Sequence, residues 1–204
     1  MIKRGFAPIF DKNSKILIIG SMPSIASIKF GFYYGHKNNR FWKTLAAIFD
    51  DKLLVSRNLE QIMILDLQST EFSAQQNFKQ TESKNSEIYA KFAINGKINV
   101  HIKYKIDFLL REKIALYDTV KSADIKGSAD ASIKNYRVND LDEILEISDI
   151  KAIFANGKKS YEIAKKVLNN DKRLMLLNST SSANARVSLD DLINEWSQKI
   201  FKFL

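Results

Sequence analysis

The chain has 204 residues, of which 45% are hydrophobic, so it is long enough to bury a substantial core in one domain. Its 32 Lys and Arg residues exceed its 23 Asp and Glu residues, and the formal net charge of +9 favours an anionic partner such as DNA. The chain has no cysteine and only two histidines, which excludes disulfides, thiolate metal centres and iron–sulfur clusters and argues against a histidine-built metal site.

The N-terminal segment does not have the pattern of a signal sequence. Asp11, Lys12 and Lys15 interrupt its apolar stretches, and no later apolar run approaches the ~20 residues that a membrane-spanning helix needs. We therefore expect a soluble, cytoplasmic protein that does not contact a membrane.

The first part of the chain predicts a strand followed by a helix. Residues 16–19 are four consecutive large aliphatic side chains, as in a buried strand of a parallel sheet. Residues 40–49 place Phe41, Leu45 and Ile48 at helical spacing, which predicts an amphipathic helix.

Residues 68–113 break this pattern, and we interpret them as an insertion within a single domain that spans residues 1–204. The segment opens with a run rich in Gln, Ser, Asn and Lys. Further on, Asn95-Gly96 is a strong signal for a type I′ turn, and the flanking residues 89–94 and 97–104 carry alternating apolar side chains. These features predict an inserted β-hairpin.

The second part of the chain alternates between strands and helices. The expected strands cover residues 114–117, 152–155 and 174–177, and the expected helices cover residues 140–147, 160–168 and 188–203. Such alternation is typical of an α/β fold with three layers, in which helices flank both faces of a mainly parallel sheet of about four strands.

The loop that follows the first strand is the first candidate site. It contains Gly20, Ser21, Met22 and Pro23, and α/β proteins bind ligands at the carboxyl ends of their strands. Tyr33 and Tyr34 come shortly afterwards and offer flat surfaces for stacking a planar group. These residues predict a crevice that holds a nucleobase.

Three short motifs in this region resemble those of a known enzyme family. They are Gly-Ser-Met-Pro-Ser at residues 20–24, Phe-Tyr-Tyr-Gly-His at 32–36 and Asn-Arg-Phe-Trp at 39–42. Together they are similar to the first motif of the hypoxanthine-DNA glycosylases, a branch of the uracil-DNA glycosylase superfamily, and residues 39–42 also resemble the mismatch-specific uracil-DNA glycosylases. The resemblance continues in order through residues 114–196.

The resemblance implies a uracil-DNA glycosylase-like fold and a monofunctional DNA glycosylase. Such an enzyme flips a deaminated base out of double-stranded DNA, here hypoxanthine, and hydrolyses its N-glycosidic bond without a metal or cofactor. We expect a monomer. Two alternatives stay open: a uracil or mismatch-specific glycosylase, and a catalytically inactive homologue that binds damaged DNA.

Asn39 is the residue on which the catalytic hypothesis depends. Its position before the helix at residues 40–49 favours a helix cap when it is considered alone. Mismatch-specific relatives position water with an Asn where this chain has Met22, whereas the hypoxanthine branch carries its catalytic amide in the segment matched by Asn39. The resemblance therefore implies that Asn39 is catalytic, and the two roles are compatible.

Residues 177–185 form the second candidate motif, after the last strand. The resemblance implies that this loop grips DNA through short polar side chains, although a Ser/Thr turn that caps a helix would look the same. Asn178 and Ser182 replace two prolines of the family pattern, which predicts a less rigid loop. The residues assigned to DNA binding are Arg40, Ser179, Thr180, Ser181 and Asn184.

Four other polar residues leave alternatives open. Asn156 follows a strand and could read the edge of a base or simply form a turn with Gly157. His36 could contact a phosphate or the leaving base, or it could brace its loop. For Asp118 and Asp130 we favour structural roles, because the resemblance places no catalytic acid there.

Overall fold

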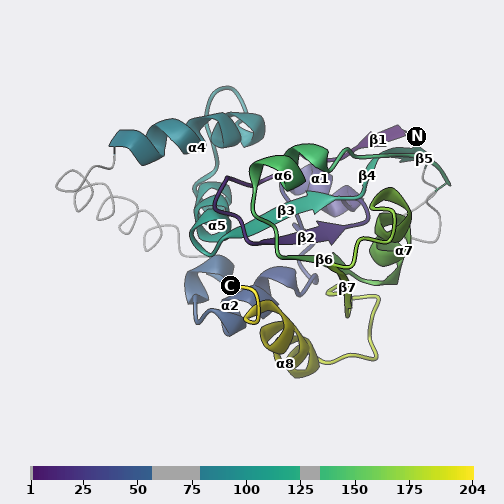
Figure 1. Cartoon of the computed structure of the whole chain (residues 1–204). Coiled ribbons are helices and arrows are strands. Elements are labelled where there is room, and N and C mark those ends of the chain that lie inside the picture. Colours follow the sequence, from purple (N-terminus) through teal and green to yellow (C-terminus); the bar gives the residue numbers. More distant parts are fainter. Residues whose placement is uncertain (1, 57–78, 125–133) are drawn as a thin grey trace.

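The computed structural model describes residues 2–56, 79–124 and 134–204. Its central feature is a four-stranded sheet in the order β3-β2-β6-β7, in which every neighbouring pair is parallel (Figure 1). The strands are β2 (Ile16–Gly20), β3 (Ile114–Asp118), β6 (Ala152–Asn156) and β7 (Leu174–Leu177). All four predicted strands and the α/β class are confirmed.

Helices cover both faces of this sheet. Alternate side chains of a strand point to opposite faces, so Ile16 and Ile18 join one cluster of the core and Leu17 and Ile19 join another. The first cluster includes residues of α2 (Phe41–Ile48), α5 (Val100–Arg111) and α8 (Leu189–Ile200), and the second includes residues of α6 (Asp142–Ile147) and α7 (Lys158–Val167). The predicted three-layer arrangement is therefore correct.

The predicted β-hairpin is wrong, although its turn is right. Asn95 and Gly96 have φ values of 51° and 75°, and a bridge joins Ile94 to Lys97, as a type I′ turn requires. The chain on either side is helical, forming α4 (Lys79–Phe92) and α5. Residues 68–78, at the start of the predicted insertion, lie outside the described residues.

The helical spacing of buried residues explains this outcome. Ile102, Ile106 and Leu109 recur at intervals of three to four and are buried against the sheet. Asn99 begins α5 by accepting a hydrogen bond on its side chain from the backbone N–H of His101. Over a short stretch, apolar residues at helical spacing also fit the alternation of a strand.

A second sheet was not predicted. It is antiparallel, has the order β1-β4-β5, and consists of β1 (Ile2–Arg4), β4 (Val120–Asp124) and β5 (Lys134–Val138). Its central strand β4 begins two residues after β3 ends, so this sheet extends from the edge of the main one. Asp130 lies outside the described residues.

Two short helices complete the described structure: α1 (Ile25–Phe30), which follows β2, and the 3-10 helix η1 (Lys52–Val55), which follows α2. Ser24 caps α1 by accepting a hydrogen bond from the N–H of Ser27. None of the described helices combines the length and the apolar character that a membrane crossing would require.

Candidate active site

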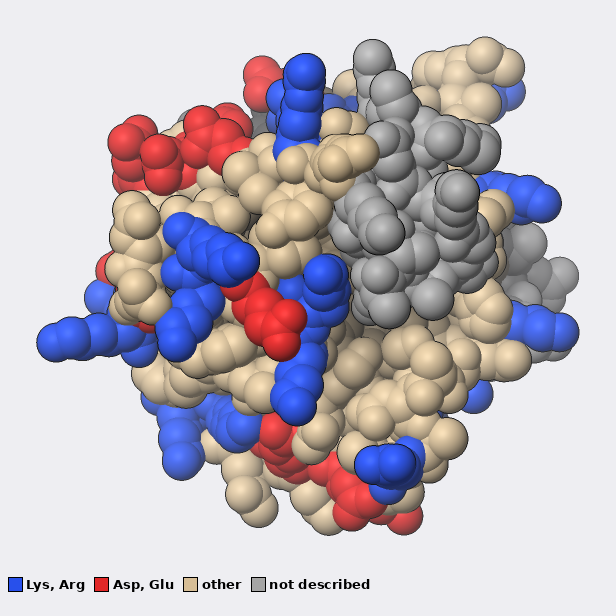
Figure 2. Space-filling model, turned by 90° about the vertical axis from the view of Figure 1, so that its right-hand side faces the viewer, with Lys and Arg blue, Asp and Glu red and all other residues tan. Residues whose placement is uncertain are grey.

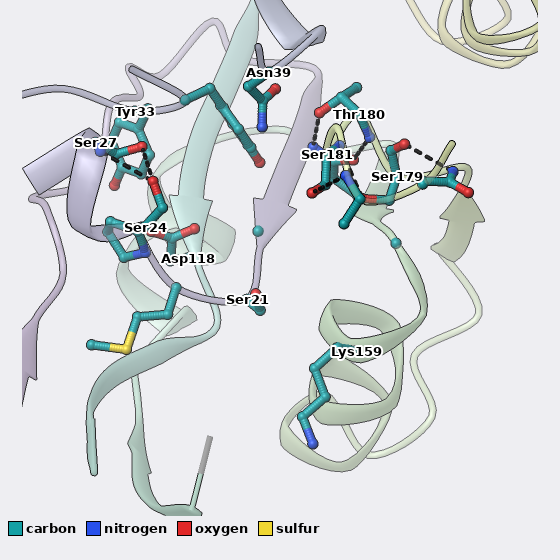
Figure 3. Close-up of a pocket in the computed structure, with 18 of the residues that line it drawn as sticks. Ser21, Ser24, Ser27, Tyr33, Asn39, Asp118, Lys159, Ser179, Thr180 and Ser181 are labelled. Carbon is teal, nitrogen blue, oxygen red and sulfur yellow. Dashed lines mark hydrogen bonds between the residues drawn. The ribbon is translucent and has the colours of Figure 1, made fainter. Parts of the chain in front are cut away.

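A pocket of about 500 Å³ lies at the carboxyl ends of the parallel strands. The last residues of β2, β3 and β6 all line it, namely Gly20, Asp118 and Asn156, and the loop after β7 closes the opposite side (Figure 3). Parallel pairing brings these strand ends together, because Gly20 pairs directly with Asp118 across β2 and β3. The volume lies within the range of small-molecule binding sites.

Most of the predicted site residues line this pocket, and two do not. Those that line it are Gly20, Ser21, Met22, Pro23, Tyr33, Tyr34, Asn39, Asn156, Ser179, Thr180, Ser181 and Asn184. His36 and Arg40 are absent from its lining and support the surrounding loops instead.

The two predicted aromatic residues have different surroundings. Tyr34 stacks on Phe41 at a centroid distance of 3.9 Å and an angle of 16°, so α2 supports its ring. Tyr33 is only 2% exposed, and its hydroxyl donates a hydrogen bond to the backbone oxygen of Ala7 at 2.9 Å. Burial, and then the negative charge of Asp118, raises the pKa of Tyr33 well above its usual value. Of the two, Tyr34 is the better stacking surface.

Asn39 both supports the start of α2 and lines the pocket. Its Oδ1 accepts a hydrogen bond from the backbone N–H of Phe41 at 2.9 Å. The other end of the same amide, Nδ2, is directed into the pocket, as Figure 3 shows. The amide therefore presents hydrogen-bond donors to a ligand in a fixed orientation.

Arg40 joins the first loop to the second. Its Nη2 donates to the backbone oxygens of Ser181 at 3.1 Å and Asn184 at 2.9 Å, and its Nη1 donates to that of Val187. Its backbone N–H also donates to the oxygen of Thr180 at 3.0 Å. These bonds use the guanidinium to hold the shape of the second loop, which is a different role from the predicted contact with DNA.

Asn156 holds the same loop from the end of β6. Its Nδ2 donates to Thr180 Oγ1 and its Oδ1 accepts from the Thr180 backbone N–H, both at 2.9 Å. Asn184 Nδ2 donates to the backbone oxygen of Ser179 at 3.0 Å. Internal hydrogen bonds thus restrain the loop, although Asn178 and Ser182 stand in it where the family pattern has prolines.

His36 braces the first loop. Its Nδ1 accepts a hydrogen bond from the Asn38 backbone N–H at 3.1 Å, and its backbone oxygen accepts from that of Asn39 at 2.8 Å. These bonds fix the turn that leads into α2. These bonds match the bracing role among the three considered for His36, and its contacts with a phosphate or a base stay predictions.

Three charged residues that sequence reasoning did not assign to the site also line the pocket: Asp118, Lys158 and Lys159. Asp118 ends β3, and Lys158 and Lys159 begin α7 directly after Gly157. Their positions just at or after predicted strand ends could have identified them in the sequence, because the carboxyl ends of parallel strands lie at the same edge of a sheet.

The surface at this edge is rich in basic groups. Figure 2 looks onto the end of the molecule toward which the parallel strands point, and Lys and Arg side chains are spread widely over it with smaller groups of acidic ones between them. Such a surface attracts a polyanion. Within the residues that the structure describes, no cluster of three or more His, Asp or Glu could hold a metal ion.

Comparison with known proteins places the chain in a family. Residues 7–201 match the family model of the uracil DNA glycosylase superfamily, so the chain belongs to that superfamily. Its relatives include a protein named hypoxanthine DNA glycosylase from Methanosarcina barkeri, which is 29% identical over 97% of this chain and 98% of its own length.

Two matches come from Methanosarcina acetivorans. One is also named hypoxanthine DNA glycosylase and is 28% identical over 92% of both chains. The other is a solution NMR structure of a candidate uracil DNA glycosylase, with a TM-score of 0.65 and 25% identity over 100% of this chain and 99% of its own. The fold and the family expected from the sequence are confirmed.

Proposed function

We propose that this protein is a monofunctional DNA glycosylase that flips hypoxanthine out of DNA and hydrolyses its N-glycosidic bond, leaving an abasic site. The observation that carries the proposal is the placement of Asn39, whose amide is fixed by Phe41 at one end and faces the pocket at the other. The names of the two full-length relatives support hypoxanthine as the base.

The pocket supplies what this hydrolysis needs. Tyr34, held against Phe41, offers the flipped base a stacking surface, and the Asn39 amide donates to the attacking water or to the departing base. The water oxygen forms a bond to C1′ of the sugar while the bond from C1′ to N9 breaks, and its electron pair leaves with the base. The attacking water loses one proton to solvent, and the departing base anion takes up one proton from solvent, so one water molecule is consumed overall.

The loop at residues 178–184 would hold the DNA around the extruded nucleotide. Ser179, Thr180 and Ser181 line the pocket opposite Asn39, and short hydroxyl groups suit phosphate contacts. Arg40 and Asn156 restrain this loop through hydrogen bonds, so we assign them to its support. Lys158 and Lys159 add positive charge on the same wall.

The test is an excision assay on duplexes that contain a single hypoxanthine, uracil, xanthine or adenine residue, with alkali to cleave abasic sites. We expect alkali-labile product from hypoxanthine. Product from uracil alone would assign the protein to the alternative specificity. Tight binding without cleavage of any duplex would identify an inactive homologue and reject the enzymatic proposal.

We further propose that residues 1–204 form one domain and that the protein acts as a cytoplasmic monomer without a metal or cofactor. The mechanism uses only side chains of one chain and water. Sedimentation of the protein alone and bound to a hypoxanthine duplex tests the monomer. Excision that persists in a chelator tests the independence from metal.

A further inference from the structure

The backbone of Tyr34 has an unusual conformation. Its φ of 54° lies in the left-handed region, which bulky side chains rarely adopt. The other described non-glycine residues with positive φ are Asn, Asp or Lys, and none of them lines the pocket. Strain of this kind persists only where surrounding contacts enforce it, and it is common at functional sites. Neighbouring residues therefore hold Tyr34 in place, at the surface on which we place the flipped base.

The chain directly after Tyr34 packs closely against α1. An ideal Cβ atom at Gly35 would lie 2.6 Å from Cδ1 and 2.7 Å from Cβ of Phe30, so any larger residue at this position would displace Phe30. On its other side, the Tyr34 ring stacks on Phe41 of α2. The strained residue thus lies between two helices, and a bond from α1 to its segment can fix its conformation.

Ser27 of α1 makes such a bond. Its Oγ accepts a hydrogen bond from the Gly35 backbone N–H at 3.1 Å, and its backbone oxygen accepts one from the Phe32 N–H at 3.3 Å. The two bonds enclose Tyr33 and Tyr34. Ser27 is only 3% exposed, so removal of its hydroxyl would leave the Gly35 N–H without this partner and without ready access to water. The backbone of Tyr34 could then leave the left-handed region.

Ser24 in turn fixes the hydroxyl of Ser27. Its Oγ lies 3.0 Å from Ser27 Oγ and accepts a hydrogen bond from the Ser27 backbone N–H at 3.1 Å. Figure 3 shows the two serines joined in this way beside Tyr33, and both line the pocket. The acceptor of the Gly35 N–H therefore has a defined orientation. A continuous set of hydrogen bonds connects the start of α1 to the residue that follows Tyr34.

We propose that Ser27 is a positioning residue, which holds Tyr34 in its left-handed conformation and thereby orients the ring on which the flipped base stacks. This inference rests on the proposed function, because it takes a flipped base as the occupant of the pocket. Ser27 acts through Tyr34 and does not contact the base. Loss of its hydroxyl weakens the binding of the base and leaves the contacts to the DNA backbone unchanged.

A double-mutant cycle between Ser27→Ala and Tyr34→Gly tests the proposal by equilibrium binding. Glycine removes the ring and adopts the left-handed conformation without strain, so the loop keeps its shape. Two duplexes that resist cleavage serve as probes. One carries hypoxanthine on a 2′-fluoroarabino sugar, and the other carries tetrahydrofuran, which has no base. The affinity for the first divided by the affinity for the second measures how much the base contributes.

We expect Tyr34→Gly to lower this ratio by roughly 10-fold or more, the usual contribution of stacking a base on an aromatic ring. Ser27→Ala should lower it by roughly 3- to 10-fold when Tyr34 is present, and by less than about 2-fold in the Tyr34→Gly background. Affinity for the tetrahydrofuran duplex should match wild type in every variant, which establishes that each is folded. The control Ser148→Ala removes a buried hydroxyl that donates to the Asp11 backbone oxygen outside the pocket, and it should leave the ratio unchanged.

Three results would overturn the inference. An unchanged ratio in Ser27→Ala would show that the bond to Gly35 does not position the ring. Equal losses from Ser27→Ala with and without the Tyr34 ring would mean that Ser27 contacts the base directly or only stabilises the fold. An equal loss of affinity for both duplexes would indicate general damage to the protein. If the wild-type protein cleaves no natural duplex yet the cycle shows coupling, the proposed function fails and this inference stands.

Discussion

Asn39 combines two roles that a single substitution to alanine would confuse. Its Oδ1 accepts a hydrogen bond from the backbone N–H of Phe41, and its Nδ2 faces the pocket. Aspartate keeps an oxygen for the first role and removes the donor required for the second. The pair of variants Asn39→Asp and Asn39→Ala therefore separates support of the Phe41 backbone N–H from catalysis.

We expect Asn39→Asp to unfold at nearly the wild-type temperature but to excise hypoxanthine at least about 100-fold more slowly, the usual cost of losing a donor to a transition state. Asn39→Ala should lose excision and also about 1 kcal/mol of stability, because the hydrogen bond from the Phe41 backbone N–H to Asn39 Oδ1 is lost. Single-turnover excision and thermal unfolding measure the two effects. A wild-type rate in Asn39→Asp would leave Asn39 with only a structural role at the start of α2.

The sequence predicted which residues gather at the site better than it predicted their hydrogen-bond partners. Tyr34 and Asn39 could be found because they follow a predicted strand in recognisable motifs. The hydrogen bonds from Arg40 to Ser181 and Asn184 could not, because they join loops that are far apart in the chain. That Asp118 lines the pocket was not predicted either, because its position there depends on the pairing of β3 with β2.

Among the elements, α5 shows how the segment at residues 79–111 attaches to the core. Lys105 on α5 lies beneath aromatic rings, with its Nζ 4.8 Å from the ring centre of Trp42 and 5.5 Å from that of Phe30. These rings attract the cation, but burial lowers the pKa of Lys105 to about 8. Desolvation therefore outweighs the attraction.

This pKa gives the stability contribution of Lys105 a defined pH dependence. Below pH 8 the Lys105 amine is protonated in both the folded and the unfolded chain, so the full cost of burying its charge is present. Between pH 8 and about 10.5 only the unfolded chain keeps the proton, and this cost is relieved as the pH rises.

We expect Lys105→Met to be more stable than wild type at pH 7, with the difference in unfolding temperature shrinking between pH 8 and 10. Thermal unfolding of both proteins across this range measures it. Lys151→Met, at an exposed residue paired with Asp149, provides a control whose difference from wild type should stay constant there. A constant difference for Lys105→Met would show that its amine is not desolvated.

The same segment shows the limit of sequence reasoning about elements. Asn95 and Gly96 determined the turn because their left-handed conformations are a local property. Whether the flanks became strands or helices depended on burial of Ile102, Ile106 and Leu109 against the main sheet. A short apolar pattern fits either period, and tertiary packing selected the helix.

For the whole molecule, the net charge of +9 and the position of Lys158 and Lys159 at the pocket predict strongly salt-dependent DNA binding. The plot of log affinity against log salt should be steep. Replacing both lysines by Gln should reduce its slope by about 2, since each phosphate contact contributes about 0.9. Titration of a fluorescent hypoxanthine duplex at several salt concentrations measures this.

Lys151→Gln is a control for the loss of a surface lysine, because Lys151 precedes β6 at the opposite end of the strand from the pocket and pairs with Asp149. Its slope should equal that of wild type. Equal slopes for the double variant and wild type would place the DNA away from α7.

The sequence by itself determined the strands of the main sheet, most helices, the two polar loops and the resemblance to a glycosylase family. These depend on periodicity and short motifs, which are local in the chain. Only the tertiary structure decided that Asp118 stands beside Gly20 and Tyr34, that Arg40 and Asn156 hold the second loop, and that β1, β4 and β5 form another sheet. Those contacts join distant segments, and their geometry depends on strand register and packing, which no local pattern specifies.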